Sequence, residues 1–162
     1  MEILAGLGEQ EAASWMKEAA EVAKSARCHR AKCGSVIVSN GKIIGRGYNA
    51  PPLDQESHRM CEADRSAGKE KYDRTCCVHA EWRAIMDALR RNPDRLAGSK
   101  LYFMRIDEAG QMKKSGQPYC TVCSRLALDT GVGSFLLWHE EGIGEYPTDE
   151  YNRLSYEYRE NN

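Results

Sequence analysis

Two short polar motifs, each at the start of an expected helix, restrict how this chain can fold. His79 and Glu81 open the helical segment HAEWRAIMDALRR, and the Cys-x-x-Cys of Cys120 and Cys123 opens CTVCSRLALDTG. Thiols at positions i and i+3 share a helix face, and the free N–H groups of the first turn favour the thiolate. One imidazole and two thiolates form a zinc ligand set if the two helix starts meet. We therefore expect a fold that brings them together.

A Cys-x-x-Cys motif alone is ambiguous: it can supply two ligands of a zinc site, or it can be a redox-active pair. A redox pair would follow the first strand of a thioredoxin-like pattern, whereas Cys120 follows the third expected strand. A ligand set of one His and two Cys leaves a fourth position open, which is typical of catalytic zinc. Glu81 lies two residues from His79 and can face that position as a proton shuttle without coordinating. The plainer alternative is a capped helix and two buried thiols.

The hydrophobic pattern predicts alternating helices and strands. The expected helices cover 10–27, 79–91 and 120–131, and the expected strands cover 36–38, 43–44, 101–106 and 134–139, with a two-residue turn at Asn40-Gly41. Polar segments connect them at 50–75 and 108–118, and a tyrosine-rich tail over 141–162 is expected to form a short helix packed on the domain or on a partner subunit. This order predicts a single layered α/β domain over 1–162.

Composition excludes several classes of protein. The net charge of −1 argues against a large nucleic-acid footprint, and no apolar run is long enough for a membrane span. The N-terminus lacks the basic start and apolar stretch of a signal peptide, so we expect a cytoplasmic protein. Seven cysteines in a reducing compartment favour metal binding over disulfides.

The sequence resembles the cytidine/deoxycytidylate deaminase superfamily of zinc-dependent nucleobase deaminases, and most of all its deoxycytidylate branch. Its H-x-E and P-C-x-x-C motifs are matched by His79-Ala80-Glu81 and by PYCTVC over 118–123. Upstream, CHRAKCGSVIV over 28–38 is similar to the branch's C-x-R-x-x-V-G-A-V-I-V, and GYNAPP over 47–52 is similar to G-Y-N-G-x-P.

The resemblance implies a cytidine-deaminase-like α/β/α fold of three layers, with a mixed sheet of about five strands and helices on both faces. It also implies roles for individual residues. These are zinc binding by His79, Cys120 and Cys123, catalysis by Glu81, and substrate binding by Asn49, Ala80, Tyr119 and Arg30. Asn49 would contact the sugar, and Arg30 a phosphate; a turn asparagine and a solvated arginine are the alternatives.

Two positions depart from the family pattern. Tyr119 stands between Pro118 and Cys120, where the family has proline directly before cysteine, and Ala50 replaces the glycine of G-Y-N-G. Glycine permits a closer backbone approach than alanine does. Both changes lie where substrate choice is made, so we expect the wall of the pocket to differ there.

Some members of the deoxycytidylate branch carry a second, structural zinc that ties the long loop to the helix before the active site. Cys28, Cys61 and Cys77 fall near the corresponding places, with Cys76, His58 or His29 as the fourth ligand. Such a metal would explain how the polar segment 50–75 stays ordered. The alternative is that these cysteines are small buried hydrophobic residues.

Together these features predict a zinc-dependent hydrolytic deaminase. Its expected substrate is a small-molecule cytosine nucleotide or nucleoside, converted to the uracil form with release of ammonia, and the protein is expected to be a homo-oligomer. One alternative is deamination of another base, adenine or guanine, or of cytosine in single-stranded nucleic acid. Action on a nucleic acid would require a basic groove. Another is a catalytically silent zinc-binding subunit, against which the intact Glu81 argues.

Overall fold

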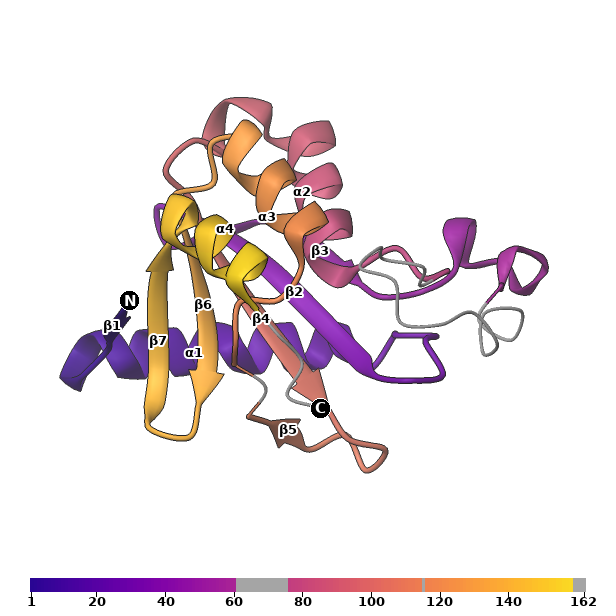
Figure 1. Ribbon diagram of the computed structural model, residues 1–162, viewed down its shortest axis with the longest axis horizontal. Coiled ribbons are helices and arrows are strands. Elements are labelled where there is room, and N and C mark those ends of the chain that lie inside the picture. Colours follow the sequence, from indigo (N-terminus) through magenta and orange to yellow (C-terminus); the bar gives the residue numbers. More distant parts are fainter. Residues whose placement is uncertain (61–75, 115, 159–162) are drawn as a thin grey trace.

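A mixed sheet with helices on both faces forms the protein, as the computed structural model shows for residues 1–60, 76–114 and 116–158 (Figure 1). The helices are α1 (Gly6–Ala23), α2 (Ala80–Arg91), α3 (Thr121–Asp129) and α4 (Thr148–Glu157). The strands are β1 (Glu2–Ile3), β2 (Lys32–Ser39), β3 (Lys42–Tyr48), β4 (Lys100–Ile106), β5 (Met112–Lys113), β6 (Ser134–His139) and β7 (Gly142–Pro147). The predicted three-layer fold is confirmed, with seven strands in place of about five.

The strands follow the order β1-β7-β6-β4-β2-β3, and β5 pairs with the free edge at the end of β4. Strands β4 and β6 are parallel, while every other strand pair is antiparallel. Parallel neighbours need a long crossover, which is usually helical. The chain supplies it with α3, so this crossover places the Cys-x-x-Cys beside the carboxyl end of β4.

The hairpin between β2 and β3 has the turn that its sequence predicts. Asn40 and Gly41 have φ angles of 50° and 66°, the left-handed conformation that both central residues of a type I′ turn require. Because this turn matches the twist of the two strands, it sets their register at the edge of the sheet.

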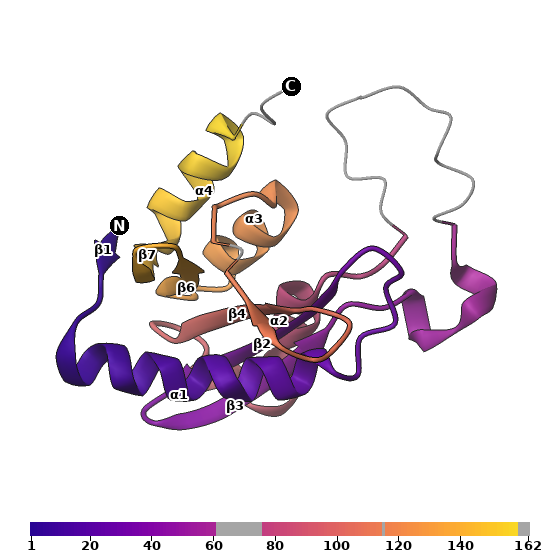
Figure 2. The same ribbon diagram turned by 90° about the horizontal axis from the view of Figure 1, so that it is seen from below.

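Two apolar cores lie on opposite faces of the sheet. Along β2, Val36 and Val38 pack with α1, while Ile37 packs with α2 and α3, because successive strand residues point to opposite faces. Figure 2 shows α1 on one side of the sheet and α3 and α4 on the other. The functional residues described below lie on the α2 and α3 side.

Helix α2 lies unusually close to β3. A Cβ atom on Gly47 would lie 2.2 Å from the carbonyl oxygen of Ala80 and 2.3 Å from the backbone nitrogen of Ala84. Only glycine fits at such a contact. The first turn of α2, which carries Glu81, is therefore held directly against the sheet.

Several elements differ from the sequence-based expectations. Helix α1 begins at Gly6, before residue 10, and strand β7 fills the first part of the tail, ahead of the expected short helix, which is α4. Strand β5 lies in the segment expected to be only a polar connection. Short strands of this kind have little pattern of their own and exist because they pair with neighbours.

In the part of the chain that the structure describes, each helix is too short or too polar to cross a membrane. The expected loop over 50–75 is described only to residue 60, where it contains 3-10 turns at Pro52–Asp54 and Glu56–His58; the remainder lies outside the described residues.

Candidate functional site

The starts of α2 and α3 meet and bring the three expected zinc ligands together. His79 is the N-cap residue of α2, and Cys120 is the N-cap residue of α3. The His79 Nδ1 atom lies 3.2 Å from Cys120 Sγ and 3.3 Å from Cys123 Sγ. All three ligand atoms lie within 4.8 Å of one another. The two sequence motifs therefore form one site.

The chemistry of this group fits a zinc ion. Nitrogen and sulfur ligands of a tetrahedral zinc are roughly 3.6 Å apart, slightly more than the separations observed here. The hydrogen bond with the Cys123 side chain lowers the pKa of the Cys120 thiol to about 5, and His79 acts in the same direction. The Cys123 N–H also donates to Cys120 Sγ at 3.2 Å. Because the thiolate is the form that binds metal, this environment favours a metal ligand.

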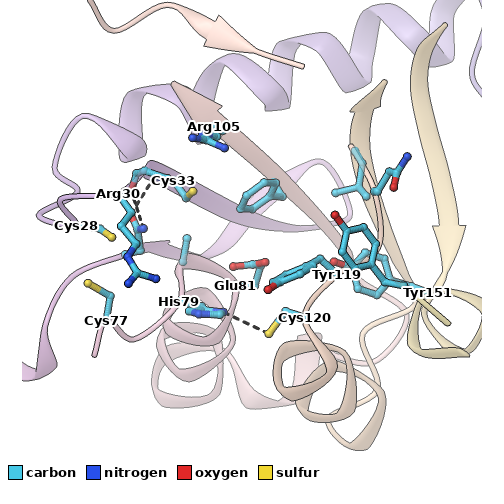
Figure 3. Close-up of a pocket in the computed structure, with 17 residues that line it drawn as sticks. Cys28, Arg30, Cys33, Cys77, His79, Glu81, Arg105, Tyr119, Cys120 and Tyr151 are labelled. Atoms are coloured by element: carbon cyan, nitrogen blue, oxygen red, sulfur yellow. Dashed lines mark hydrogen bonds between the residues drawn. The ribbon is translucent and has the colours of Figure 1, made fainter. Parts of the chain in front are cut away.

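Glu81 lies beside the three ligands but is not one of them. Glu81 belongs to the first turn of α2, is 7% exposed, and lines the pocket in front of the ligand group. Figure 3 shows the carboxylate close to His79 and Cys120. A carboxylate held at this place can exchange protons with a molecule bound at the open side of the ligand group.

The pocket in front of this group has a volume of about 470 Å³. In Figure 3, Cys28, Arg30 and Cys77 lie at one end of it, Tyr119 and Tyr151 lie at the other, and Glu81 lies between them. A volume of this size suits a small molecule.

Asn49 and Ala80, two expected substrate-binding residues, are buried and line the pocket. The Asn49 side-chain oxygen accepts the backbone N–H of Cys33 at 2.9 Å, and its amide donates to the carbonyl of Ala31 at 2.8 Å. Asn49 therefore fixes the start of β2. Its amide group still has a second N–H to offer a ligand.

Tyr119, the residue that departs from the family motif, stands at the mouth of the pocket. Its side chain is 56% exposed and meets Tyr158 edge to face, with ring centroids 4.9 Å apart. Tyr151 lies deeper and stacks on Phe135 at 3.9 Å. Burial raises the pKa of Tyr151 far above its usual value, and the charge of Glu81 adds to this effect.

The sequence did not identify Tyr151, Tyr158 or Arg105 as pocket residues. The tyrosine-rich tail is expected to serve packing, and Tyr151 both packs and lines the pocket. For Arg105 a signal is present, because an arginine interrupts the otherwise apolar strand LYFMRI. Which face of that strand the arginine occupies depends on the register of the sheet.

The expected structural metal site is only partly described. Cys28 and Cys77 lie at the same end of the pocket (Figure 3), and Cys76 Sγ lies 4.0 Å from Cys77 Sγ. Cys61 lies outside the described residues. Among residues 1–60, 76–114 and 116–158, His79, Cys120 and Cys123 form the one group of three candidate metal ligands. The histidines proposed as fourth ligands face other groups: His58 Nδ1 lies 3.1 Å from the Pro52 carbonyl, and His29 lies 4.0 Å from Glu56.

Hydrogen bonds hold the described part of the loop after β3. Asp54 accepts from Tyr48 at 2.6 Å and from Arg83 of α2 at 2.8 Å, and its backbone carbonyl accepts from Arg27 at 3.0 Å. Arg27, a basic residue that could otherwise meet a phosphate, is therefore engaged in holding the loop.

Comparison with known proteins places the chain among deaminases. Residues 9–137 match the family model for the cytidine and deoxycytidylate deaminase zinc-binding region. The deoxycytidylate deaminase of Mycobacterium phage D29 is 29% identical over 121 residues, which cover 70% of this chain and 83% of the phage protein. That of Schizosaccharomyces pombe is 32% identical over 81 residues, but these cover 47% of this chain and only 25% of the yeast protein.

Solved structures share the fold at lower identity. The dCMP deaminase of cyanophage S-TIM5 in complex with dCMP and dUMP aligns with a TM-score of 0.55, 20% identity and 82% coverage of both chains. Cytidine deaminase from Burkholderia pseudomallei aligns with a TM-score of 0.56 and 15% identity, covering 86% of this chain and 94% of the other. Since the family model spans most of the sequence and includes all of the His-x-Glu and Cys-x-x-Cys motifs, this chain belongs to the cytidine and deoxycytidylate deaminase family.

Proposed function

We propose that this protein is a zinc-dependent hydrolytic deaminase that converts a cytosine nucleotide to the uracil nucleotide and ammonia. Deoxycytidylate is the preferred substrate, followed by cytidylate or the free nucleoside. The observation that carries the proposal is the buried Glu81 carboxylate beside a three-ligand group that leaves one coordination position open. The relatives named deoxycytidylate deaminases support the choice of base and of phosphate.

The metal would be held by His79 Nδ1 and by the sulfur atoms of Cys120 and Cys123. When bound, zinc supplies a Lewis acid that makes water a nucleophile at neutral pH. The position of both cysteines at the start of α3 keeps the thiolates fixed, because the N–H groups of the first turn point toward them.

Glu81 would move the protons of the reaction. Its carboxylate accepts a proton from the attacking water and passes it to the ring nitrogen next to the amino-bearing carbon. It then takes the remaining proton of the hydroxyl group added at that carbon and delivers it to the departing amino group. The carbon–nitrogen bond breaks as ammonia leaves, and the carbon–oxygen bond of the uracil product remains. The low exposure of Glu81 keeps bulk water away from this transfer.

The remaining pocket residues would hold the substrate. Asn49 has one free amide N–H for the sugar, and Ala80 presents its small side chain where the base must approach Glu81. Tyr119 forms the wall at the mouth, and Arg30 lies at the opposite end with a positive charge for the phosphate. With these roles, the sugar would lie beside Asn49 and the phosphate toward Arg30.

A panel of substrates tests the function. Zinc-loaded protein should release ammonia from deoxycytidylate fastest, more slowly from cytidylate and the nucleosides, and not from adenine or guanine compounds or cytosine oligonucleotides. Preferred release from another base or from an oligonucleotide would replace the substrate assignment. Absence of release from every compound, with zinc present, would favour the silent zinc-binding subunit.

A second, structural zinc near Cys28 and Cys77 is also proposed, supported by the position of these two thiols at one end of the pocket and of Cys76 Sγ beside Cys77 Sγ. Metal analysis should then give close to two zinc ions per chain, and Cys61→Ala should remove one of them and lower the melting temperature. A content of one zinc ion in the wild-type protein would contradict this second site.

We further propose that the protein is a cytoplasmic homo-oligomer. Sequence periodicity places Trp82, Met86 and Leu89 on the inward face of α2, but these side chains are 37%, 40% and 41% exposed. They recur at helical spacing and so form an apolar stripe that a second copy could cover. Light scattering should report a multimer, and Met86→Glu should shift it toward monomer; a monomeric wild-type protein would contradict the proposal.

A further inference from the structure

Two basic residues stand directly opposite each other where β5 joins the sheet. In the antiparallel pairing of β4 and β5, Arg105 is the register partner of Lys113. Directly opposed residues of a strand pair project from the same face, and like charges at such positions are destabilising. The short β5 strand therefore places two positive charges together at a cost in stability.

Neither charge is neutralised by an acid within residues 1–60, 76–114 and 116–158. The nearby acidic groups have other partners: Glu108 pairs with Lys32 at 3.0 Å, and the Asp107 side chain accepts the backbone N–H of Gln111 at 2.8 Å. Lys114, the next residue after Lys113, pairs with Glu140 at 3.1 Å. Among the described residues near β5, Arg105 and Lys113 thus differ from Lys32 and Lys114 in having no ion pair with a carboxylate.

One member of this basic pair, Arg105, lines the active-site pocket. Arg105 is also the register partner of Cys33 in β2, and both residues line the pocket together with Phe103, which lies two positions earlier in β4. Figure 3 shows Arg105 beside Cys33 at the edge of the pocket. The sheet register sets Lys113 on the same face as Arg105. Among the described residues that line this pocket, Glu81 is the single carboxylate.

We propose that Arg105 and Lys113 act together with Arg30 to bind the phosphate group of the nucleotide substrate and thereby set the preference for nucleotides over nucleosides. The inference rests on the proposed function and adds two specificity-determining residues to it. An arginine offers a planar, two-pronged donor that matches phosphate oxygens, and a lysine adds a mobile point charge. A bound phosphate would also relieve the repulsion between the two side chains, which explains how the sequence tolerates their placement.

Substrate discrimination provides the first test. The ratio of kcat/KM for deoxycytidylate to that for deoxycytidine is measured for the zinc-loaded wild type, Arg105→Gln and Lys113→Gln. Each substitution should lower kcat/KM for the nucleotide about ten-fold or more, because a charge-assisted contact is lost, and leave the nucleoside within about two-fold. The matched control, Lys114→Gln, removes an adjacent lysine that pairs with Glu140 and should leave the ratio unchanged. Equal losses for both substrates, or no loss, would overturn the inference.

A second readout does not depend on turnover. Inorganic phosphate should raise the melting temperature of the wild type, and this rise should be smaller in Arg105→Gln and Lys113→Gln. Without phosphate, Lys113→Gln should melt at the same temperature as the wild type or higher, since a like-charge contact is removed. A phosphate effect that is unchanged in both variants would contradict the basic pair as the anion site. If no cytosine compound is deaminated, the proposed function fails, while this measurement still decides whether the pair binds phosphate.

Discussion

Cys120 caps α3 and is also one of the three proposed metal ligands. Its sulfur accepts the N–H of Cys123, as an N-cap side chain does, and it lies 3.2 Å from His79 Nδ1 as a metal ligand does. The same local geometry therefore caps the helix and prepares the thiolate. The identity of this residue is tied to the metal, because serine would serve the cap alone.

Replacing this thiol should remove the metal. Cys120→Ser keeps a capping oxygen, so the protein should fold but lose its active-site zinc and its deaminase activity. Cys33→Ala, which removes a pocket thiol outside the ligand group, should keep the full zinc content. Metal analysis and circular dichroism of both variants decide the point, and a zinc-loaded, active Cys120→Ser protein would contradict the assignment.

Asp54 stabilises the loop after β3 by a charge that depends on pH. Burial acts to raise its pKa, but the hydrogen bonds from Tyr48 and Arg83 outweigh this and hold the pKa of Asp54 below its usual value. An aspartate in the unfolded chain has a pKa of about 3.9. The stabilisation by Asp54 is therefore complete above that pH and is lost as the pH falls through the lower pKa of Asp54 in the folded protein.

Asp54→Asn should accordingly lower the free energy of unfolding at pH 7 by about 1 kcal/mol. The difference in melting temperature between wild type and variant should stay constant from pH 8 to pH 6 and shrink toward pH 3. Asp94→Asn, in an exposed 3-10 turn, serves as the control. A difference that does not change with pH would show that the charge of Asp54 is not involved.

Residues that carry their chemistry in a local motif can be predicted from the sequence, and residues that depend on packing cannot. His79, Glu81, Cys120 and Cys123 meet as expected, because each pair lies in one short motif at a helix start. Arg105 reaches the pocket through the register of β4 against β2 and β5, which no local pattern specifies.

At the level of elements, the contact between α2 and β3 sets the position of the active-site helix. Gly47 of β3 packs directly against the backbone of α2, so position 47 has no room for a side chain. By contrast, a Cβ atom on Gly8 in α1 would have no neighbouring atom within 4 Å, and the helix is solvent-exposed at that point.

These two glycines should respond oppositely to alanine. Gly47→Ala should lower the free energy of unfolding by about 3 kcal/mol, since the new methyl group meets backbone atoms that cannot move aside. Gly8→Ala should leave stability unchanged or raise it by up to about 1 kcal/mol, because alanine favours helix. Chemical denaturation measures both, and a neutral Gly47→Ala would contradict the close packing of α2.

The long periodic helices and the Asn-Gly hairpin could be predicted, whereas short strands and helix orientation could not. Strand β5 has two residues and β7 contains two glycines, so neither has the alternating pattern of a strand. Within α2, the apolar residues cover more of the helix surface than the sheet can bury. Periodicity alone predicts that Trp82 and Met86 point inward, whereas both side chains are exposed in the structure.

At the scale of the whole molecule, the sheet joins two cores and two active-site helices. We propose that residues 1–162 form one domain, supported by strand β4, whose residues contribute to both cores. Thermal unfolding followed by tryptophan fluorescence and by circular dichroism should then give coincident transitions. Separate transitions would indicate two independent units.

We propose that the ligand group, the pocket and Glu81 act together in one deamination reaction. This claim is tested most directly by following conversion of deoxycytidylate to deoxyuridylate by the zinc-loaded wild type and by Glu81→Gln. The wild type should turn the substrate over, and Glu81→Gln should keep its zinc and its fold while kcat falls roughly 10³-fold, because the proton shuttle is lost. Wild-type turnover by zinc-loaded Glu81→Gln, or full activity of the wild type without metal, would contradict the claim.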